Sequence, residues 1–178
     1  MTRRTAPRLL LAAAVAVSLA ACGSDESSGA AAPTSSACET QQPTAEAPAG
    51  ISTDLSVRPA APCYDAEPPT DLVVSDVVVG SGAEAVAGSA VAVKYVGSFY
   101  ETGEAFDASW DSGDDTTFPV TLGAGQVIAG FDQGITGMQV GGRRMVVIPS
   151  DLGYGPDAAG PIPGGSTLVF VIDLVSVG

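Results

Sequence analysis

The sequence predicts an α+β domain in its C-terminal part, in which one short helix packs against an antiparallel sheet. Only one segment has helical spacing, because Ile128, Phe131, Ile135 and Met138 recur at intervals of three and four residues. Apolar side chains also occupy both faces of one predicted strand, with Leu168, Phe170, Ile172 and Leu174 on one face and Val169, Val171 and Val175 on the other. A lone amphipathic helix against such strands is an α+β arrangement.

The other strands are predicted from alternating or continuous apolar and β-branched residues. In chain order they lie at about 71–80, around Val91, Val93 and Tyr95 on a shared face, at 117–122 and at 143–149. The C-terminal strand is apolar on both faces, so we expect it to be central and covered on both sides. Gly134 and Gly137 each weaken the helix by about 1 kcal/mol relative to alanine, so packing must hold it.

The composition is acidic, with seven Lys and Arg residues against twenty Asp and Glu residues, no histidine and a formal net charge of -13. Nucleic-acid binding requires patches of Lys and Arg, so we exclude nucleic acid as a partner. The lack of histidine excludes Ser-His-Asp and Cys-His catalysis and the commonest zinc sites. We expect no metal and no cofactor.

The N-terminus has the pattern of an export signal over residues 1–21. Three arginines precede an apolar run that ends in Leu19-Ala20-Ala21-Cys22, which resembles the bacterial lipobox. We expect Cys22 to carry a lipid that anchors the chain to the outside of a bacterial cell membrane. An ordinary cleaved signal and a transmembrane anchor are the alternatives, although the run is shorter than the roughly 20 residues that span a bilayer.

Residues 22–70 are rich in Ala, Pro, Ser and Thr and lack sustained periodicity, which predicts a disordered tether. The domain is then expected over 71–178. Cys38 and Cys63 lie in the tether, and outside the cytoplasm such a pair forms a disulfide most simply. A catalytic pair is the alternative, but the two cysteines are not in a C-x-x-C arrangement.

Six sequence blocks between residues 93 and 174 resemble those of the FKBP-type immunophilins, which are peptidyl-prolyl cis-trans isomerases. The blocks are VKYVG (93–97), AFDAS (105–109), FPVTLG (118–123), QVIAGFDQGITGMQVGGRR (126–144), IPSDLGYG (148–155) and IPGGSTLVFVIDL (162–174). The resemblance implies a strongly curved antiparallel sheet of about five strands wrapped around one short α-helix. It also implies that the chain accelerates the isomerisation of Xaa-Pro bonds.

The resemblance further implies the residues of a binding pocket between the sheet and the helix. The catalytic group comprises Tyr95, Asp107, Tyr154 and Phe170. The substrate-binding group comprises Phe106, Phe118, Val127, Ile128, Phe131 as the floor, and Ile162 closing one side. In this scheme the Ile128 N–H and the Tyr154 hydroxyl hold peptide carbonyls, and Asp107, hydrogen-bonded to Tyr95, orients the rotating carbonyl. Each apolar member could instead be plain core, and Asp107 could be a turn former.

The chain departs from the family in the segment that follows Asp107, where residues 110–115 contain no arginine to face this carboxylate. We expect a monomer that acts on proline-containing segments of exported proteins and binds macrolide inhibitors, with membrane contact through the lipid alone. The alternatives are a non-catalytic immunophilin-like chaperone or proline-peptide binding module, and a surface β-domain with an adhesive role.

Overall fold

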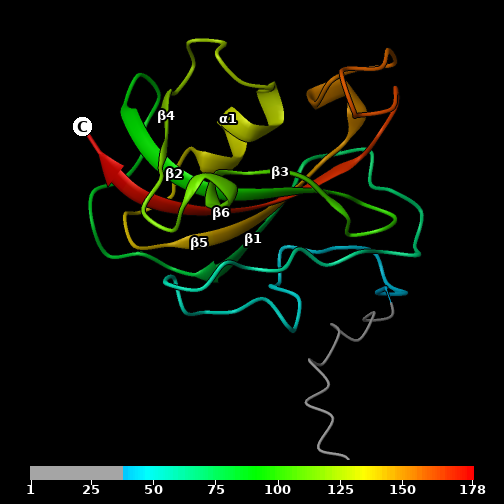
Figure 1. Ribbon diagram of the computed structural model, residues 1–178, viewed down its shortest axis with the longest axis horizontal. Helices are drawn as coiled ribbons and strands as arrows, with labels where there is room; N and C mark the ends of the chain where they lie inside the picture. The colour runs from blue at the N-terminus through cyan, green and yellow to red at the C-terminus, as the bar shows by residue number, and fades with distance from the viewer. Residues whose placement is uncertain (1–37) are drawn as a thin grey trace, which may run out of the picture. The chain divides into compact units, whose positions relative to one another are not determined.

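The computed structural model describes residues 38–178, whose centre is a six-stranded antiparallel sheet with one short α-helix on one face (Figure 1). The strands are β1 (Val73–Val78), β2 (Ala90–Phe99), β3 (Ala105–Ala108), β4 (Phe118–Thr121), β5 (Arg143–Ile148) and β6 (Leu168–Val177). The helix is α1 (Ala129–Ile135), and two 3-10 helices are η1 (Ser109–Ser112) and η2 (Ser150–Leu152). The α+β prediction is therefore confirmed, with six strands in place of about five.

The strand that the sequence did not predict is β3, whose sequence Ala-Phe-Asp-Ala contains only one residue that favours strands. It is defined by pairing, because β2 is long enough to hold two partners along one edge. Residues 90–93 of β2 pair with β4, and residues 96–98 pair with β3. The sheet order is β1-β5-β6-β2-β3, with β4 beside β2. Register shifts in β2 at Ala92/Val93 and Gly97/Ser98 add bends to a sheet that is curved and open.

Helix α1 is shorter than the predicted periodicity. Ile128 is its N-cap residue, and Met138 lies beyond its end, after Gly137 with a φ of 83°. Met138 is nevertheless buried, because the chain turns back on the core immediately after the helix. The glycines of α1 allow a close approach to β5: a Cβ at Gly130 would lie 2.4 Å from Ile148 Cγ2, and one at Gly134 would lie 2.7 Å from Val146 Cγ2. Packing on β5 thus offsets the weak helix propensity.

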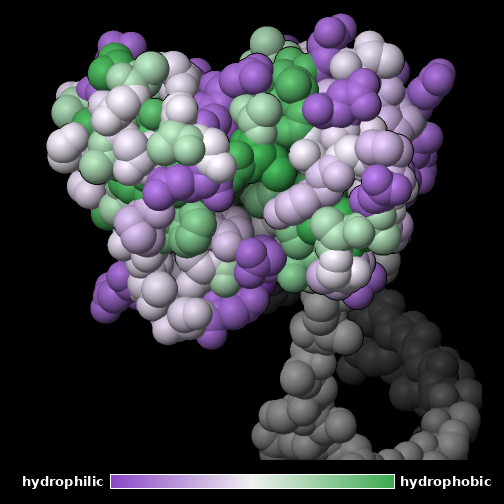
Figure 2. Space-filling view, turned by 90° about the horizontal axis from the view of Figure 1, so that it is seen from above, coloured by the Kyte–Doolittle hydropathy of each residue, from purple (hydrophilic) through white to green (hydrophobic). Residues whose placement is uncertain are grey.

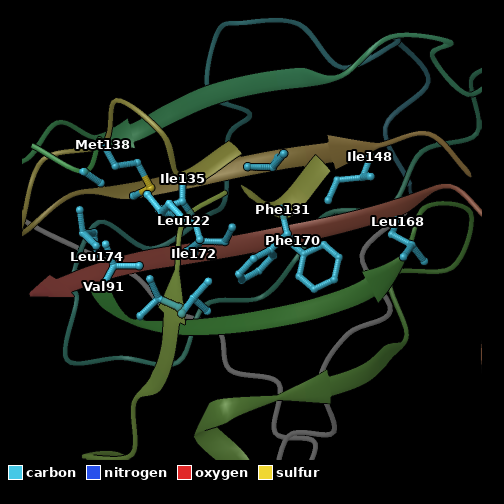
Figure 3. Close-up of a cluster of buried hydrophobic side chains, with 14 of the residues drawn as sticks. Val91, Leu122, Phe131, Ile135, Met138, Ile148, Leu168, Phe170, Ile172 and Leu174 are labelled. Carbon is cyan, nitrogen blue, oxygen red and sulfur yellow. The ribbon is translucent and has the colours of Figure 1, made fainter. Parts of the chain in front are cut away.

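Strand β6 is central and is buried on both faces, as predicted. Leu168, Phe170 and Ile172 belong to the larger core cluster beneath α1 (Figure 3). Val169 and Val171 point to the other face, where they join a second cluster. The other buried members of that cluster are Ile51, Tyr64, Tyr100, Met145 and Val147. Val175, predicted on this covered face, is 42% exposed near the end of the strand.

The second face is covered by residues 38–70, which we call the covering segment and which Figure 1 shows in blue to green on the side of the sheet away from α1. The prediction of a disordered tether is wrong for these residues. Their composition is poor in large apolar groups, but Ile51 and Tyr64 place such groups on the sheet and are 8% and 3% exposed. Full burial of one such side chain stabilises by about 1.5–3 kcal/mol. Residues 1–37, which contain the predicted signal, Cys22 and the start of the predicted tether, lie outside the described residues.

A buried ion pair fixes the covering segment to the sheet. Arg143 of β5 donates from Nε and Nη2 to the two carboxylate oxygens of Asp173 in β6, at 2.5 and 2.6 Å. The same guanidinium donates to the carbonyl oxygens of Ser52 at 2.6 Å, Asp54 at 3.2 Å and Val57 at 3.0 Å. The Arg143 side chain is fully buried, and these five contacts offset the cost of removing its charge from water.

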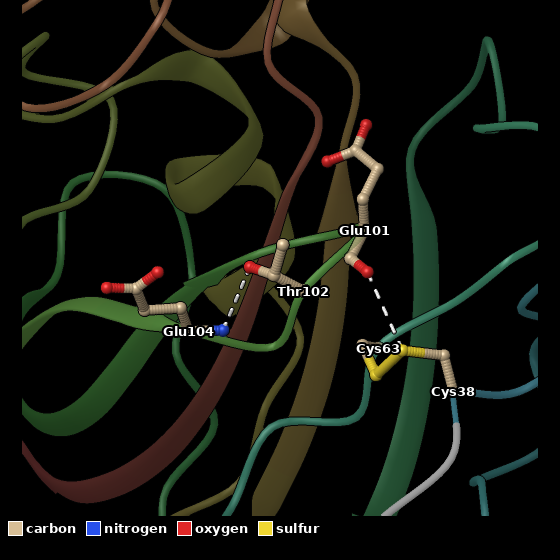
Figure 4. The surroundings of a disulfide bond; sticks show 5 residues. All are labelled: Cys38, Cys63, Glu101, Thr102 and Glu104. Atoms are coloured by element: carbon tan, nitrogen blue, oxygen red, sulfur yellow. Dashed lines mark hydrogen bonds between the residues drawn. A yellow bond between two sulfur atoms is a disulfide. The ribbon is translucent and has the colours of Figure 1, made fainter. Parts of the chain in front are cut away.

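The predicted disulfide is present and joins Cys38 to Cys63 beside the turn between β2 and β3 (Figure 4). Cys38 Sγ lies 3.5 Å from the carbonyl oxygen of Glu101 in that turn. Gly103, with a φ of 66°, lies against the bridge, where a Cβ would be 3.3 Å from Cys63 Cβ. The loop that the bridge closes is packed on the sheet, so its constraint on the unfolded chain stabilises the folded domain, by about 3–4 kcal/mol in the loop-entropy model.

Within residues 38–178, no helix has both the length and the apolar character needed to cross a membrane.

Substitution Arg143→Met should lower the free energy of unfolding by about 3–5 kcal/mol, because it leaves Asp173 buried without a partner and three carbonyls without a donor. Urea unfolding monitored by circular dichroism measures the change. The matched control is Arg58→Met, since Arg58 and its partner Asp111 are 43% and 60% exposed and such pairs contribute about 1 kcal/mol or less. Equal losses in the two variants would contradict the role given to Arg143.

Candidate functional site

An aromatic pocket of about 430 Å³ opens beside α1. Figure 2 shows the molecule from above relative to Figure 1, and hydrophobic residues gather around a hollow in this face. The residues that line the pocket are Tyr95, Phe106, Asp107, Phe118, Gln126, Val127, Ile128, Phe131, Tyr154 and Phe170. They come from β2, β3, β4, α1 and its preceding loop, the loop after η2, and β6. Segments far apart in the sequence thus converge on one cavity.

The rings in this pocket contact one another mostly edge to face. The Tyr95 ring centroid lies 5.6 Å from that of Phe118 and 5.8 Å from that of Phe131, with interplanar angles of 71° and 82°. Phe170 lies 5.2 Å from Phe131 and 5.7 Å from Phe106, at 76° and 83°. Edge-to-face packing holds each ring against its neighbours in a fixed orientation. The walls of the cavity are therefore preformed.

Gly97 in β2 makes room for two of these rings. A Cβ at this position would lie 2.7 Å from Cε1 of Phe170 and 2.8 Å from Cζ of Phe106. In a sequence, a glycine commonly indicates a turn, where its backbone freedom is needed. The structure places Gly97 in the middle of a strand, directly against the pocket wall. A single sequence does not separate these two uses of glycine, because the difference lies in the side chains that pack over it.

Tyr95 and Asp107 form the polar edge of the pocket. The Tyr95 hydroxyl donates to Asp107 Oδ2 at 2.6 Å, which confirms the predicted hydrogen bond. Burial of the phenol, followed by its hydrogen bond to Asp107, raises the pKa of Tyr95 well above its usual range. The Tyr95 phenol is therefore a neutral hydrogen-bond donor across the physiological pH range. The bond holds the exposed Asp107 carboxylate at the rim.

Two further groups offer hydrogen-bond donors at the pocket. Ile128 is the N-cap residue of α1, and its carbonyl accepts from the amides of Phe131 at 3.0 Å and Asp132 at 3.2 Å. No acceptor in residues 38–178 takes the Ile128 N–H. Tyr154 lines the pocket from the loop after η2 and is 44% exposed, so its phenol is accessible to a ligand.

The predicted residues fall into one constellation with one exception. All of the predicted pocket residues except Ile162 line the cavity. Ile162 is 5% exposed and belongs to the core cluster under α1, so it supports the site from behind. Its apolar character gave no means to separate these two positions.

Gln126 is the lining residue that the sequence reasoning missed. Its side-chain oxygen accepts from the Thr121 amide at 2.9 Å and holds the loop between β4 and α1. Its position immediately before Val127 and Ile128 was the available signal.

The segment after Asp107 lacks the arginine of typical relatives, and no cation of residues 38–178 forms an ion pair with this carboxylate. The covering segment supplies a cation to the same loop, because Arg58 pairs with Asp111.

Trp110 is 6% exposed and packs beneath the loop with Val96 and Ala108, with Lys94 Nζ 4.5 Å above its ring. This tryptophan has a structural role that its polar surroundings in the sequence did not indicate.

The site offers apolar aromatic walls with a few donors at the edge. Such a cavity binds a compact apolar ring and places hydrogen-bond donors near the groups attached to it. An amide that twists loses double-bond character and polarity, so a dry aromatic surface favours the twisted form over the planar one.

Comparisons with known proteins agree with this geometry. The family model described as FKBP-type peptidyl-prolyl cis-trans isomerase matches residues 82–175. A protein of Corynebacterium glutamicum named "Probable FK506-binding protein" is 53% identical over 108 residues, which cover 61% of this chain and 88% of that protein. The "FK506-binding protein" of Streptomyces anulatus is 54% identical over 113 residues, covering 62% and 90%.

Solved structures show the same fold. The crystal structure of AtFKBP13 superposes with a TM-score of 0.56 at 37% sequence identity, covering 62% of this chain and 96% of that one. FkpA from Escherichia coli superposes with a TM-score of 0.55 at 31% identity, covering 66% of this chain and 51% of that one. The antiparallel sheet with one helix of this chain thus matches the fold of its FKBP neighbours.

Substitution Gly97→Ala should lower kcat/KM for isomerisation of a proline-containing peptide by about tenfold or more, because the new methyl group displaces Phe170 and Phe106. A protease-free isomerisation assay measures the change. Gly134→Ala is the matched control, since its Cβ meets Val146 at the same 2.7 Å but away from the pocket lining. The control should lose stability by about 1–3 kcal/mol and keep its kcat/KM. Equal activity in wild type and Gly97→Ala would show that the ring positions do not matter.

Proposed function

The chain belongs to the FKBP-type peptidyl-prolyl cis-trans isomerases, and on this premise we propose that it isomerises Xaa-Pro bonds in exported or surface proteins from a lipid anchor at Cys22. The observation that carries the activity is the convergence of Tyr95, Phe131 and Phe170 on one cavity, with Asp107 bonded to Tyr95 at its edge. A proline ring is a compact apolar group of the kind that such a cavity accepts.

Binding energy alone can supply the acceleration that Xaa-Pro isomerisation requires. Rotation about a peptide bond faces a barrier of about 18–20 kcal/mol, and uncatalysed Xaa-Pro exchange takes tens of seconds or longer. Turnover in about 10 ms requires roughly 5 kcal/mol of preferential binding to the twisted amide. Aromatic walls that exclude water, together with a few donors that hold the peptide, supply binding of this kind without a nucleophile.

Each polar group then has a role in holding the substrate. The Ile128 N–H and the Tyr154 hydroxyl donate to carbonyl oxygens of the bound peptide, which fixes the chain on both sides of the rotating bond. Asp107, held by Tyr95, orients the carbonyl that rotates. Phe131 forms the floor under the proline ring, and Phe170 and Phe106 form a wall. A macrolide such as FK506, which the relatives are named for binding, would occupy the same cavity.

A location outside the cytoplasm is supported by two independent features. The first is the lipobox-like Leu19-Ala20-Ala21-Cys22 that follows a basic and apolar N-terminus. The second is the Cys38–Cys63 disulfide, since such bridges form and persist in oxidising compartments. In that setting the enzyme would meet chains that fold after export.

A non-catalytic binding role is the second candidate, and the segment after Asp107 is the observation that favours it. Without a cation facing it, Asp107 has Tyr95 as its side-chain partner and is otherwise open to solvent. The pocket could then bind proline segments without turning them over.

The wild-type protein should accelerate Xaa-Pro isomerisation in a peptide, and FK506 should inhibit competitively. Tyr154→Phe should lower kcat/KM by about 5- to 20-fold, because it removes one donor to the substrate. Tyr64→Phe is the matched control, since this phenol lies on the other face of the sheet, where it donates to Met145 Sδ at 3.4 Å. Peptide binding without any rate effect would favour the second candidate. If the folded protein neither binds the peptide nor accelerates its isomerisation, both candidates are wrong.

Lipid at Cys22 should be visible by mass spectrometry of the mature N-terminus, as a diacylglyceryl or triacyl mass increment on this residue. Cys22→Ala should release the protein from membranes while leaving its isomerase activity intact, because the residues that line the aromatic pocket all lie between Tyr95 and Phe170. A soluble protein without lipid on Cys22 would contradict the proposed anchor and would leave the proposed isomerase activity untouched.

A further inference from the structure

A second groove lies directly beside the aromatic pocket, with a volume of about 600 Å³. Its apolar lining includes Phe99, Phe106, Pro161 and Pro163, and its acidic lining consists of Glu101 and Glu104. The groove lies between the turn that joins β2 to β3 and the loop that precedes β6. None of these residues except Phe106 lines the aromatic pocket.

Phe106 makes the two hollows continuous. Its ring lies 5.7 Å from Phe170 in the aromatic pocket and 5.3 Å from Phe99 in the second groove. Phe170, Phe106 and Phe99 therefore form a row of rings that passes from one hollow to the other. A peptide chain spans about 3.3–3.6 Å per extended residue, so residues close to a bound proline reach the second groove.

The two glutamates of the groove are exposed, and each cation of residues 38–178 contacts other groups. Arg143 and Arg144 pair with Asp173 and Asp76, and Arg58 pairs with Asp111. Lys94 donates to the Asp114 carbonyl and lies over Trp110. Glu101 and Glu104 thus have no basic partner within this part of the chain. A basic group on a bound peptide would be their natural complement.

The turn that holds these carboxylates is fixed from behind. The Phe99 amide donates to the Glu104 carbonyl at 3.0 Å, and the Tyr64 amide of the covering segment donates to the Tyr100 carbonyl at 2.9 Å. The disulfide packs against the same turn, and Figure 4 shows the side chains of Glu101 and Glu104 extending away from it. The groove is therefore built on a rigid frame, which lowers the entropy lost when a ligand binds.

We propose that the second groove binds the part of the substrate chain that flanks the proline and selects Lys or Arg there. The apolar wall of Phe99, Pro161 and Pro163 accepts the aliphatic stem of such a side chain, and Glu101 and Glu104 pair with its charged end. This inference rests on the proposed function. It makes Glu101 and Glu104 determinants of which Xaa-Pro bonds the enzyme isomerises.

The test compares proline peptides that differ in one position, with Lys, Ala or Glu placed in turn at each of the three positions before and after the Xaa-Pro bond. At one or more of these positions, wild type should show a kcat/KM about three- to tenfold higher for Lys than for Glu, and the ratio should fall as salt is raised. The double substitution Glu101→Gln with Glu104→Gln should bring the ratio close to one.

Two further variants make the result specific. The pair Glu101→Lys with Glu104→Lys should reverse the preference toward Glu. The pair Glu46→Gln with Glu84→Gln removes the same charge at exposed positions outside both hollows, and it should leave the wild-type ratio unchanged. Equal turnover of all peptides by wild type, or equal loss of preference in the control pair, would overturn the inference while leaving the isomerase activity in place. Loss of activity toward every peptide would instead count against the proposed function.

Discussion

The burial of β6 on both faces is the constraint on which the rest of the structure depends. Phe170 on one face is a wall of the aromatic pocket, while Val169 and Val171 on the other face lie in the second core cluster. A strand with apolar side chains on both faces is stable only when both are removed from water. The covering segment provides this on the side away from α1, and Arg143 fixes it there through contacts to Asp173 and to three carbonyls. Packing on one face therefore determines how firmly the pocket strand is held on the other.

The pocket follows from the same arrangement at the level of single atoms. Because Gly97 lacks a side chain, Phe170 and Phe106 lie directly on β2, and Tyr95 two residues earlier closes the ring cluster from the same strand. Burial, followed by the hydrogen bond to Asp107, raises the pKa of Tyr95 and keeps its phenol neutral. Rigid apolar walls with sparse donors are what preferential binding of a twisted amide requires, so the fold supplies the catalytic device without reactive side chains.

Most of the domain could be predicted from strong periodicity and from the sequence blocks. Features that depend on contacts between distant segments could not be predicted. The alternation in β6 and the spacing around Phe131 located the central strand and the helix, and the FKBP-like blocks placed nine of ten predicted pocket residues in the lining. Composition did not predict the covering segment, because a local average cannot register two apolar anchors and a partner arginine that lies 86 to 91 residues away. The core position of Ile162 and the role of Gly97 at the pocket wall were not predictable for a related reason, since the side chains that pack against them come from other elements.

The most direct test of this account compares the chain beginning at Cys38 with the chain beginning at Asp71, by urea unfolding and by kcat/KM toward one proline peptide. We predict that the shorter chain loses at least about 5 kcal/mol of stability or fails to fold, because Val169, Val171 and the Arg143–Asp173 pair lose their cover. Its isomerase activity should fall with its folded fraction. Equal stability and equal kcat/KM for the two chains would contradict the claim that the covered face of β6 supports the pocket.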